Sequence, residues 1–227
     1  MTMPLAALLH LCDSLFPIGS FAYSDGLEWA VKRGLVLNMD DLDRWLDVCV
    51  DESFGRCEGP VLARAWPAFR NGDWKTVIAI DEEAMALRPS SSMRAANRSM
   101  GLRLLKTWSA VRPDGRLDRA MALAADRVLG PTLAVAFAAV AVSADIPQRD
   151  ALVGFAYTRL AATVSAAMRV MPAGQTEAHR RLQAVLGRIP AIADDIVARD
   201  FIPESFSPAL DIAQMSQQYL ESRLFRS

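Results

Sequence analysis

The chain has 227 residues, of which 52% are hydrophobic and 22% are charged, and its formal net charge is -1. This length suits one domain with a sizeable core, and the composition is too apolar for disorder. The charge excludes the global basic excess that draws nucleic acids or acidic membranes, so we expect neither as a partner. Three cysteines without a CxxC pair indicate reduced thiols in a cytoplasmic protein.

The N-terminal run MTMPLAALLHLCD lacks a basic start and ends its apolar part at Asp13, which is untypical of a signal peptide. The longest uncharged run, residues 128–144, is interrupted by Gly130 and Pro131. It is too short and too rich in alanine to span a bilayer, so it predicts a buried core helix. We therefore expect a soluble protein.

Hydrophobic residues recur at the helical period along nearly the whole chain, and no run alternates like a strand. Asn38 is placed to cap a helix over 38–54, and Gly72 ends the helix after it. Asp73 caps the next helix, which Pro89 stops. Further helices are predicted over 91–111, 116–129, 131–143, 148–171, 176–186, 192–199 and 208–225. The predicted fold class is all-α, a single-domain bundle of about ten helices over residues 1–227.

The sequence shows no residue set typical of a catalytic or metal site. Phosphate-loop, nucleophile-elbow, HExxH and dinucleotide-binding motifs are absent, and His10 and His179 lie far apart. A weak site of His10 with Cys12 is an alternative to ordinary helix residues. The acidic clusters at 40–47 and 81–83 are interpreted as solvated helix faces. We expect no enzyme activity, no catalytic residue, no cofactor and no bound metal.

Four stretches combine glycine, proline, polar or charged residues in ways that a helical core does not need. The first is LFPIGSFAYSDGLE. Pro17 and Gly19 predict a sharp turn, and Asp25 with Glu28 fits a capping box for the helix that follows. Gly26 then falls inside the first helical turn, where glycine costs up to about 1 kcal/mol relative to alanine. Such a cost indicates either a tight helix crossing or a functional surface.

The other three stretches lie in the second half of the chain or near its middle. In MRAANRSMGLRLLKTW, the residues Arg94, Asn97 and Gly101 share one helix face, which suits a buried polar network, a partner groove or a solvated face. In MRVMPAGQ, Arg169 is placed to interact with the last carbonyls of its helix. The tail DIAQMSQQYLESRLFRS is amphipathic and docks either on its own core or on another protein.

Together these stretches resemble one family, the urease accessory protein UreF. The matching residues are 16–21 (FPIGSF) and 24–28 (SDGLE), then Arg94, Ala96, Asn97, Gly101, Arg103, Lys106 and Thr107, then Pro172 and Gln175, and finally residues 222–227. Two positions depart from the family pattern. Arg169 replaces the usual lysine, which keeps the charge but changes the geometry, and Gln217 with Gln218 replaces a His-Glu pair, whose role therefore does not carry over.

The resemblance implies an all-α, usually dimeric chaperone without catalytic activity of its own, acting in nickel insertion into apo-urease. It implies binding to the accessory protein UreD, called UreH in some organisms, and recruitment of the GTPase UreG for metallocentre assembly. The candidate partner-binding residues are Pro17, Gly19, Phe21, Tyr23, Ser24, Gly26, Glu28, Arg94, Asn97, Gly101, Lys106, Arg169, Pro172, Gln175, Arg223, Leu224 and Phe225.

The alternative hypothesis is a GTPase-activating regulator of UreG that supplies a catalytic arginine. The candidates are Arg94, Arg98, Arg103 and Arg223. Helix-borne arginines are common and usually solvated, so the adaptor role is preferred. Only Leu224 and Phe225 are apolar in the terminal motif, so we expect deletion of residues 222–227 to leave the fold largely intact and to weaken partner recruitment.

Overall fold

The computed structural model describes residues 4–226, and its secondary structure there is helical apart from an isolated bridge between Tyr23 and Arg226. The α-helices are α1 (Pro4–Leu11), α2 (Leu27–Lys32), α3 (Met39–Val48), α4 (Gly59–Asn71), α5 (Trp74–Ala86), α6 (Ser91–Val111), α7 (Gly115–Ala125), α8 (Leu133–Ser143), α9 (Gln148–Val170), α10 (Gln175–Leu186), α11 (Ile189–Ala198) and α12 (Pro208–Ser216). The shorter elements are the 3-10 turns η1 (Ser20–Ala22) and η3 (Gln217–Tyr219) and the π-helical segment η2 (Cys49–Glu58). The predicted all-α fold class is confirmed for these residues.

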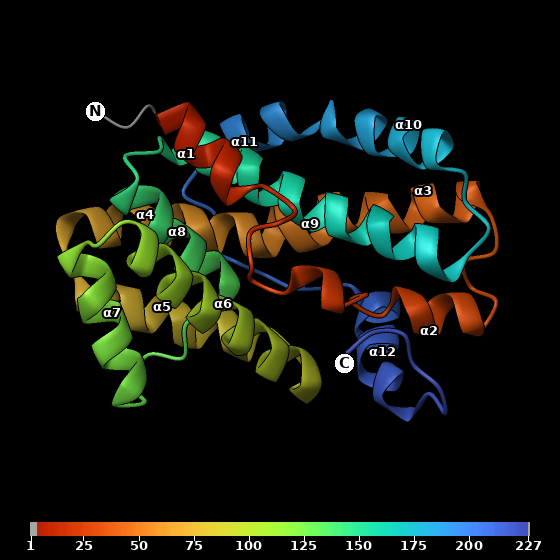
Figure 1. Ribbon diagram of the computed structural model, residues 1–227, viewed down its shortest axis with the longest axis horizontal. Coiled ribbons are helices and arrows are strands. Elements are labelled where there is room, and N and C mark those ends of the chain that lie inside the picture. The colour runs from red at the N-terminus through yellow and green to blue at the C-terminus, as the bar shows by residue number, and fades with distance from the viewer. Residues whose placement is uncertain (1–3, 227) are drawn as a thin grey trace.

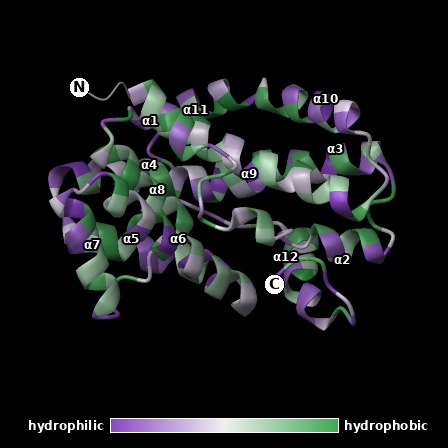
Figure 2. Ribbon diagram, in the orientation of Figure 1, coloured by the Kyte–Doolittle hydropathy of each residue, from purple (hydrophilic) through white to green (hydrophobic). Residues whose placement is uncertain are grey.

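The centre of the molecule is formed by α8 and α9 (Figure 1). α8 packs against α4 and α6, while α9 contacts α10, α11 and α2. All 11 residues of α8 are buried, and Figure 2 shows this helix in hydrophobic colours while the outer helices mix both kinds of residue. A helix covered on all sides has no solvated face to keep polar, so its composition follows from its place.

α9 is also long and apolar enough to cross a membrane by length and composition alone. In the folded chain, however, 61% of its most apolar window is buried inside the protein. Its contacts with helices on several sides show that it serves as a core helix of the bundle, which accounts for its hydropathy.

α3, η2 and α4 form one unbroken helical run over residues 39–71. Asn38 caps it as predicted, since its side chain accepts the backbone N–H of Asp41 while the Asp41 carboxylate accepts the N–H of Asn38. Gly72, at a left-handed φ of +68°, ends the run as predicted. The break expected between residues 54 and 60 is absent, because η2 continues the helix through it.

Two predicted helices are shorter in the structure. The one predicted over 116–129 ends as α7 at Ala125, and Arg127 then turns the chain with a left-handed φ of +60°. The one predicted over 208–225 ends as α12 at Ser216 and is followed by η3 and an extended tail. Backbone donors of the tail bond to the start of the chain instead of to a preceding helical turn, so a tertiary contact overrides the helical pattern.

The remaining boundary differences are smaller. α1 forms on the apolar N-terminal run, where no helix was predicted. α11 begins at Ile189 instead of residue 192. α8 begins at Leu133 instead of residue 131, because the N–H groups of the residues before it are taken by side chains from other helices.

Candidate partner-binding surface

The opening turn, residues 15–28, is anchored to the core by its buried apolar side chains. Phe16 is buried, and its ring packs on His10 and Trp108 with centroid distances of 5.3 and 5.8 Å. Pro17 is exposed above it. The chain reverses at Gly19, whose φ of +79° lies in the left-handed region that glycine adopts without strain. The predicted sharp turn is therefore present, and an aromatic contact anchors it.

Gly19 is also where the opening turn meets α6. A Cβ atom at Gly19 would lie 2.5 Å from Nη1 of Arg103, so the guanidinium rests directly against the glycine backbone. The rest of the Arg103 side chain is exposed. Two motifs that stand apart in the sequence therefore share one surface.

The capping box predicted for Asp25 and Glu28 does not form. Gly26 is the N-cap of α2, with a φ of +92°, and not a residue of its first turn. Its backbone N–H donates to Oε1 of Gln217 at 2.8 Å, and Ser24 Oγ donates to the same oxygen at 2.9 Å. The buried Gln217 thus supplies, from the other end of the chain, the acceptor that a local cap was expected to provide.

Gly26 marks a close approach between α2 and α12. A Cβ there would lie 2.9 Å from the backbone nitrogen of Gln214 and 3.0 Å from the Cβ of Ala213. Of the two interpretations of this glycine, the tight helix crossing is the one that the structure contains.

Glu28 binds the C-terminal tail, residues 220–226. Its side chain is fully buried, and its carboxylate accepts the backbone N–H of Leu224 at 2.9 Å and of Phe225 at 3.2 Å. Lys32 Nζ lies 3.3 Å from the same carboxylate. A buried charge needs such donors, because leaving it uncompensated is costly. Glu28 therefore fastens the tail to α2.

Phe225 anchors the tail. Its ring is 4% exposed and lies under the guanidinium of Arg169, 4.3 Å from the ring centroid. Arg169 also donates to the carbonyl oxygen of Phe21 at 3.3 Å, a different role from the predicted contact with its own helix end. The Arg226 N–H donates to the carbonyl of Ala22 at 2.7 Å. Of the two predicted alternatives for the tail, docking on its own chain is thus observed.

A groove of about 620 Å³, the α6–tail groove, opens beside these contacts. Its walls come from the opening turn, α6 and the tail, three of the four stretches that stand out in the sequence. The lining residues are Tyr23, Ser92, Ala95, Ala96, Ser99, Arg223, Leu224, Phe225 and Arg226. A second cavity, of about 560 Å³ between α1 and α9, has a mainly apolar lining and includes one candidate residue, Phe21.

A buried ion cluster lies beneath the opening turn. Arg159 of α9 pairs with Asp25 and, at 3.4 Å, with Glu58, whose other oxygen pairs with Arg88. Burial opposes the charge on Glu58, but the two guanidinium groups outweigh it and lower the pKa of that carboxyl. Asp25 lies 134 residues from Arg159, so sequence reasoning missed the cluster. The one available signal was a lone arginine in an otherwise apolar stretch of α9.

Asn97 and Gly101 lie in the interior and position α8. Asn97 Oδ1 accepts the N–H of Leu133 at 2.7 Å, at the start of that helix. A Cβ at Gly101 would lie 2.0 Å from the carbonyl oxygen of Pro131, so no larger residue fits at this crossing. The buried polar network, one of the three interpretations of this stripe, is what the structure contains.

The other candidate residues lie nearer the surface. Arg94 donates to two carbonyl groups of the preceding loop, at 2.6 and 2.9 Å. Lys106 is exposed on α6, and Arg223 is exposed on the tail. Pro172 is exposed in the connection from α9 to α10, and Gln175 is exposed at the first position of α10. The candidate residues therefore divide into a buried group that holds the surface and an exposed group that forms it.

The acidic cluster at 81–83 is not simply a solvated face. Asp81 is buried and accepts the backbone N–H of Gly130 at 2.9 Å and of Thr132 at 2.7 Å. Burial raises the pKa of its carboxyl, although these hydrogen bonds act in the opposite direction. The solvated-face interpretation is therefore wrong for Asp81, which helps Asn97 to cap α8.

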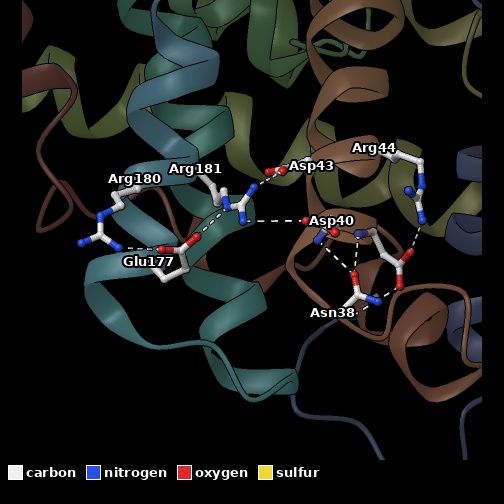
Figure 3. Close-up of polar contacts among 8 residues, drawn as sticks. Asn38, Asp40, Asp43, Arg44, Glu177, Arg180 and Arg181 are labelled. Carbon is white, nitrogen blue, oxygen red and sulfur yellow. Dashed lines mark hydrogen bonds and ion pairs between the residues drawn. The ribbon is translucent and has the colours of Figure 1, made fainter.

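The acidic cluster at 40–47 also has partners. Figure 3 shows Arg181 of α10 between Glu177 on its own helix and the carboxylates of α3. The pairs in this region are Arg181 with Asp40, Asp43 and Glu177, Arg180 with Glu177, and Arg188 with Asp47 and Asp51. We call them the α3–α10 ion pairs; some lie within α10, and the others join α10 and the residue after it, Arg188, to the helical run of α3 and η2 at the surface.

Among residues 4–226, no three His, Cys, Asp or Glu side chains are grouped so as to hold a metal ion. Burial raises the pKa of Cys12 and Cys49 to about 12, so both thiols stay protonated at neutral pH. His10 packs on the Trp108 ring, whereas Cys12 Sγ donates to the carbonyl of Gly154. The described geometry instead offers a partner cationic groups and a shaped groove.

An all-α bundle that gathers its most specified segments around a surface groove has the architecture of an accessory protein that works by contact. The family model described as UreF matches residues 36–186. The urease accessory protein UreF of Azoarcus sp. (strain BH72) is 33% identical over 231 residues, covering 99% of this chain and 96% of the relative. That of Methylibium petroleiphilum is 34% identical over 227 residues, covering 98% and 94%. The chain belongs to the UreF family of urease accessory proteins, and the resemblance drawn from its motifs is confirmed.

Proposed function

We propose that this protein is an adaptor in the maturation of the urease nickel centre. It binds the accessory protein UreD (UreH in some organisms), recruits the nickel-carrying GTPase UreG, and docks with them on apo-urease. It acts in the cytoplasm, as a homodimer, with residues 1–227 forming one domain, and it has no catalytic activity of its own. Membership in the UreF family supports the urease context of this proposal.

The observation that carries the proposal is the convergence of distant segments on one surface. The opening turn, α6, Arg169 at the end of α9 and the tail meet around Phe225. Beneath them, the buried Glu28 accepts the backbone N–H of Leu224 in the tail, and the buried Gln217 accepts that of Gly26 in the opening turn. Above them, Leu224 stays 62% exposed beside arginines. An exposed apolar residue on a rigid support, with arginines nearby, is typical of a protein-binding surface.

Co-expression with the UreD and UreG homologues of the same organism tests the adaptor role. Affinity capture of this protein followed by sizing should recover a complex with both. Leu224→Asp should reduce the capture at least about tenfold, because it places a charge at the centre of an interface. Ile202→Asp is the matched control, since Ile202 is 80% exposed outside the groove, and it should capture both partners normally.

Circular dichroism should show the same helix content for both variants, which separates lost contact from lost fold. If the wild-type protein captures neither partner, the adaptor proposal is wrong. If it captures both and Leu224→Asp does so equally well, the complex forms through another face.

The second candidate function is GTPase activation by a supplied arginine. The observation that favours it is the exposed Arg103 on α6, whereas Arg94 is already occupied by backbone carbonyls. GTP hydrolysis by UreG, with wild type against Arg103→Ala, separates the two functions. A fall of several hundredfold or more with binding intact supports a catalytic arginine, since such residues contribute about 10³–10⁵ to kcat. A fall of a fewfold together with lost binding supports the adaptor.

A further inference from the structure

We propose that the α6–tail groove binds an acidic, extended segment of a partner protein. The inference rests on the proposed adaptor function and adds the chemistry by which the partner is recognised. It is carried by the distribution of charge around the groove and by the position of the cations along α6.

None of the residues that line the groove is acidic. α6 has 21 residues, with four cations and no Asp or Glu among them. The groove-lining part of the tail contributes Arg223 and Arg226 and no carboxylate. The opening turn is uncharged from Leu15 to Ser24. Glu28, which contacts the tail, is buried and already accepts two backbone N–H groups, and Glu221 lies at the exposed start of the tail, outside the lining. The walls therefore present positive charge only.

This pattern differs from the rest of the molecule, where most arginines are paired. Among residues 4–226, no salt bridge is formed by Arg103, Lys106 or Arg226, although acidic and basic residues are almost equal in number, 26 against 25. Arg223 and Arg226 line the groove on the tail, Arg103 and Lys106 lie farther along α6, and a carboxylate near these cations would be attracted to them. The groove is thus electrostatically complementary to a negatively charged occupant.

Two of these cations lie on the same stripes of α6 as the residues that form the groove floor. Ser92, Ser99 and Lys106 follow one another at intervals of seven residues, as do Ala96 and Arg103, so each series lies on one stripe of α6. The small side chains of the floor leave room for a chain to lie close to the helix. A segment in the groove would then place its carboxylates near Arg103 and Lys106.

The shape and the charge of the whole protein favour a peptide over a nucleic acid. The groove volume of about 620 Å³ lies within the range of single binding pockets, about 300–1,000 Å³. A duplex needs a broad basic face, whereas the net charge here is -1 and the acidic residues of α3 occupy another side of the surface.

Fluorescence anisotropy with a labelled, glutamate-rich peptide as the probe tests the proposal. Wild-type protein should bind the peptide, and binding should weaken as salt is raised. The double variant Arg103→Glu and Lys106→Glu should weaken it at least about tenfold, because two attractive charges become repulsive. The matched control is Lys75→Glu with Arg119→Glu, which changes the net charge equally at exposed positions on α5 and α7. It should stay within about twofold of wild type.

Three results would overturn the inference. The first is equal peptide binding by wild type and the groove variant. The second is an equal loss in the control variant, which would show that net charge alone acts. The third is tighter binding of a DNA duplex than of the peptide at the same salt. Circular dichroism checks that each variant is folded.

Capture of the UreD and UreG homologues keeps the two proposals apart. If wild type captures them and the groove variant captures them equally well, the acidic-segment inference fails and the adaptor function stands. If wild type captures neither, the adaptor function fails, whatever the peptide does.

Discussion

The α3–α10 ion pairs and the α6–tail groove use charge in opposite ways. In the ion pairs, Arg181 and Arg188 reach carboxylates of the neighbouring helix run, and both sides of each pair stay partly exposed. Near the groove, Arg103, Lys106 and Arg226 form no salt bridge among the described residues, while Glu28 and Arg159 pair with other charged groups below the surface.

The comparison distinguishes charged groups that stabilise the fold from charged groups that a partner can contact. Exposed ion pairs are screened by water and salt and contribute little to stability. Removing one member of a buried ion pair is more costly, because the remaining charge then has neither a partner nor water around it. We infer that buried polar groups hold the groove region in place and that its exposed residues contribute little to stability. The predictions below test that division, from the largest expected effect to the smallest.

Arg159→Ala should destabilise the protein most. It leaves the buried carboxylate of Glu58 with Arg88 alone and the largely covered carboxylate of Asp25 without a guanidinium, for which we expect a loss of about 3–5 kcal/mol in the free energy of unfolding. Urea denaturation followed by circular dichroism measures it. Arg149→Ala is the matched control on the same helix, because its pair with Asp194 is exposed. Equal losses in the two variants would contradict the distinction between buried and exposed pairs.

Phe225→Ala should release the tail without unfolding the bundle. Replacing a buried phenylalanine costs up to about 3–5 kcal/mol, but a chain end can detach, so the loss is limited to the docking energy of the tail. We expect faster trypsin cleavage after Arg223, with helix content retained. Leu224→Ala is the neighbouring control, since Leu224 is largely exposed. A cooperative loss of helix in Phe225→Ala would make the tail part of the core.

Gly101→Ala tests the buried side of α6. The added Cβ would meet the carbonyl oxygen of Pro131 at 2.0 Å, so α6 and α8 must move apart, at a cost of about 1–3 kcal/mol. Gly115→Ala is the control, because nothing lies within 4 Å of its Cβ position. Thermal unfolding of both variants gives the comparison. A Gly101→Ala protein as stable as wild type would mean that this crossing is looser than described.

Acid should weaken the buried cluster in a defined direction. The pKa of Glu58 is lowered in the folded protein by Arg159 and Arg88 against the effect of burial. Its contribution is therefore fully present above the ordinary glutamate value of 4.5 and is lost as the pH falls through the lowered pKa. Urea unfolding at a series of acidic pH values should show a shallower loss for Glu58→Gln than for wild type. Parallel curves would remove Glu58 from the acid response.

The helices could be predicted because their signals are local. Asn38 and Gly72 mark ends by their own chemistry, and the apolar period shows the buried face. The tail could not be predicted, because its pattern is helical while its donors are taken by Glu28 from the other end of the chain. Hydrogen bonds between residues 196 and 197 positions apart do not affect the local hydrophobic pattern of the sequence.

Residue chemistry singled out the stretches of the candidate surface, and the resemblance supplied their partner-binding role. Motif matching selected Asn97 and Lys106 together, yet the first is buried against α8 and the second is exposed. It marked Gln217 as the loss of a titratable group, whereas that side chain accepts two hydrogen bonds that fix the opening turn. Sequence reasoning therefore proposed these residues, and the fold shows which of them are buried and which are exposed.

Arg181→Ala should have the smallest effect, and the salt dependence of that effect is its test. Arg181 bridges Glu177 and the carboxylates of α3 at the surface, so its loss should lower stability slightly at low salt. At about 1 M salt the Debye length falls to about 3 Å, and the variant should unfold together with wild type. The loss in Arg159→Ala should persist under the same conditions, because buried pairs are screened much less. If Arg181→Ala costs as much as Arg159→Ala, or if salt leaves its effect unchanged, the α3–α10 ion pairs are structural supports and the two regions do not differ in kind.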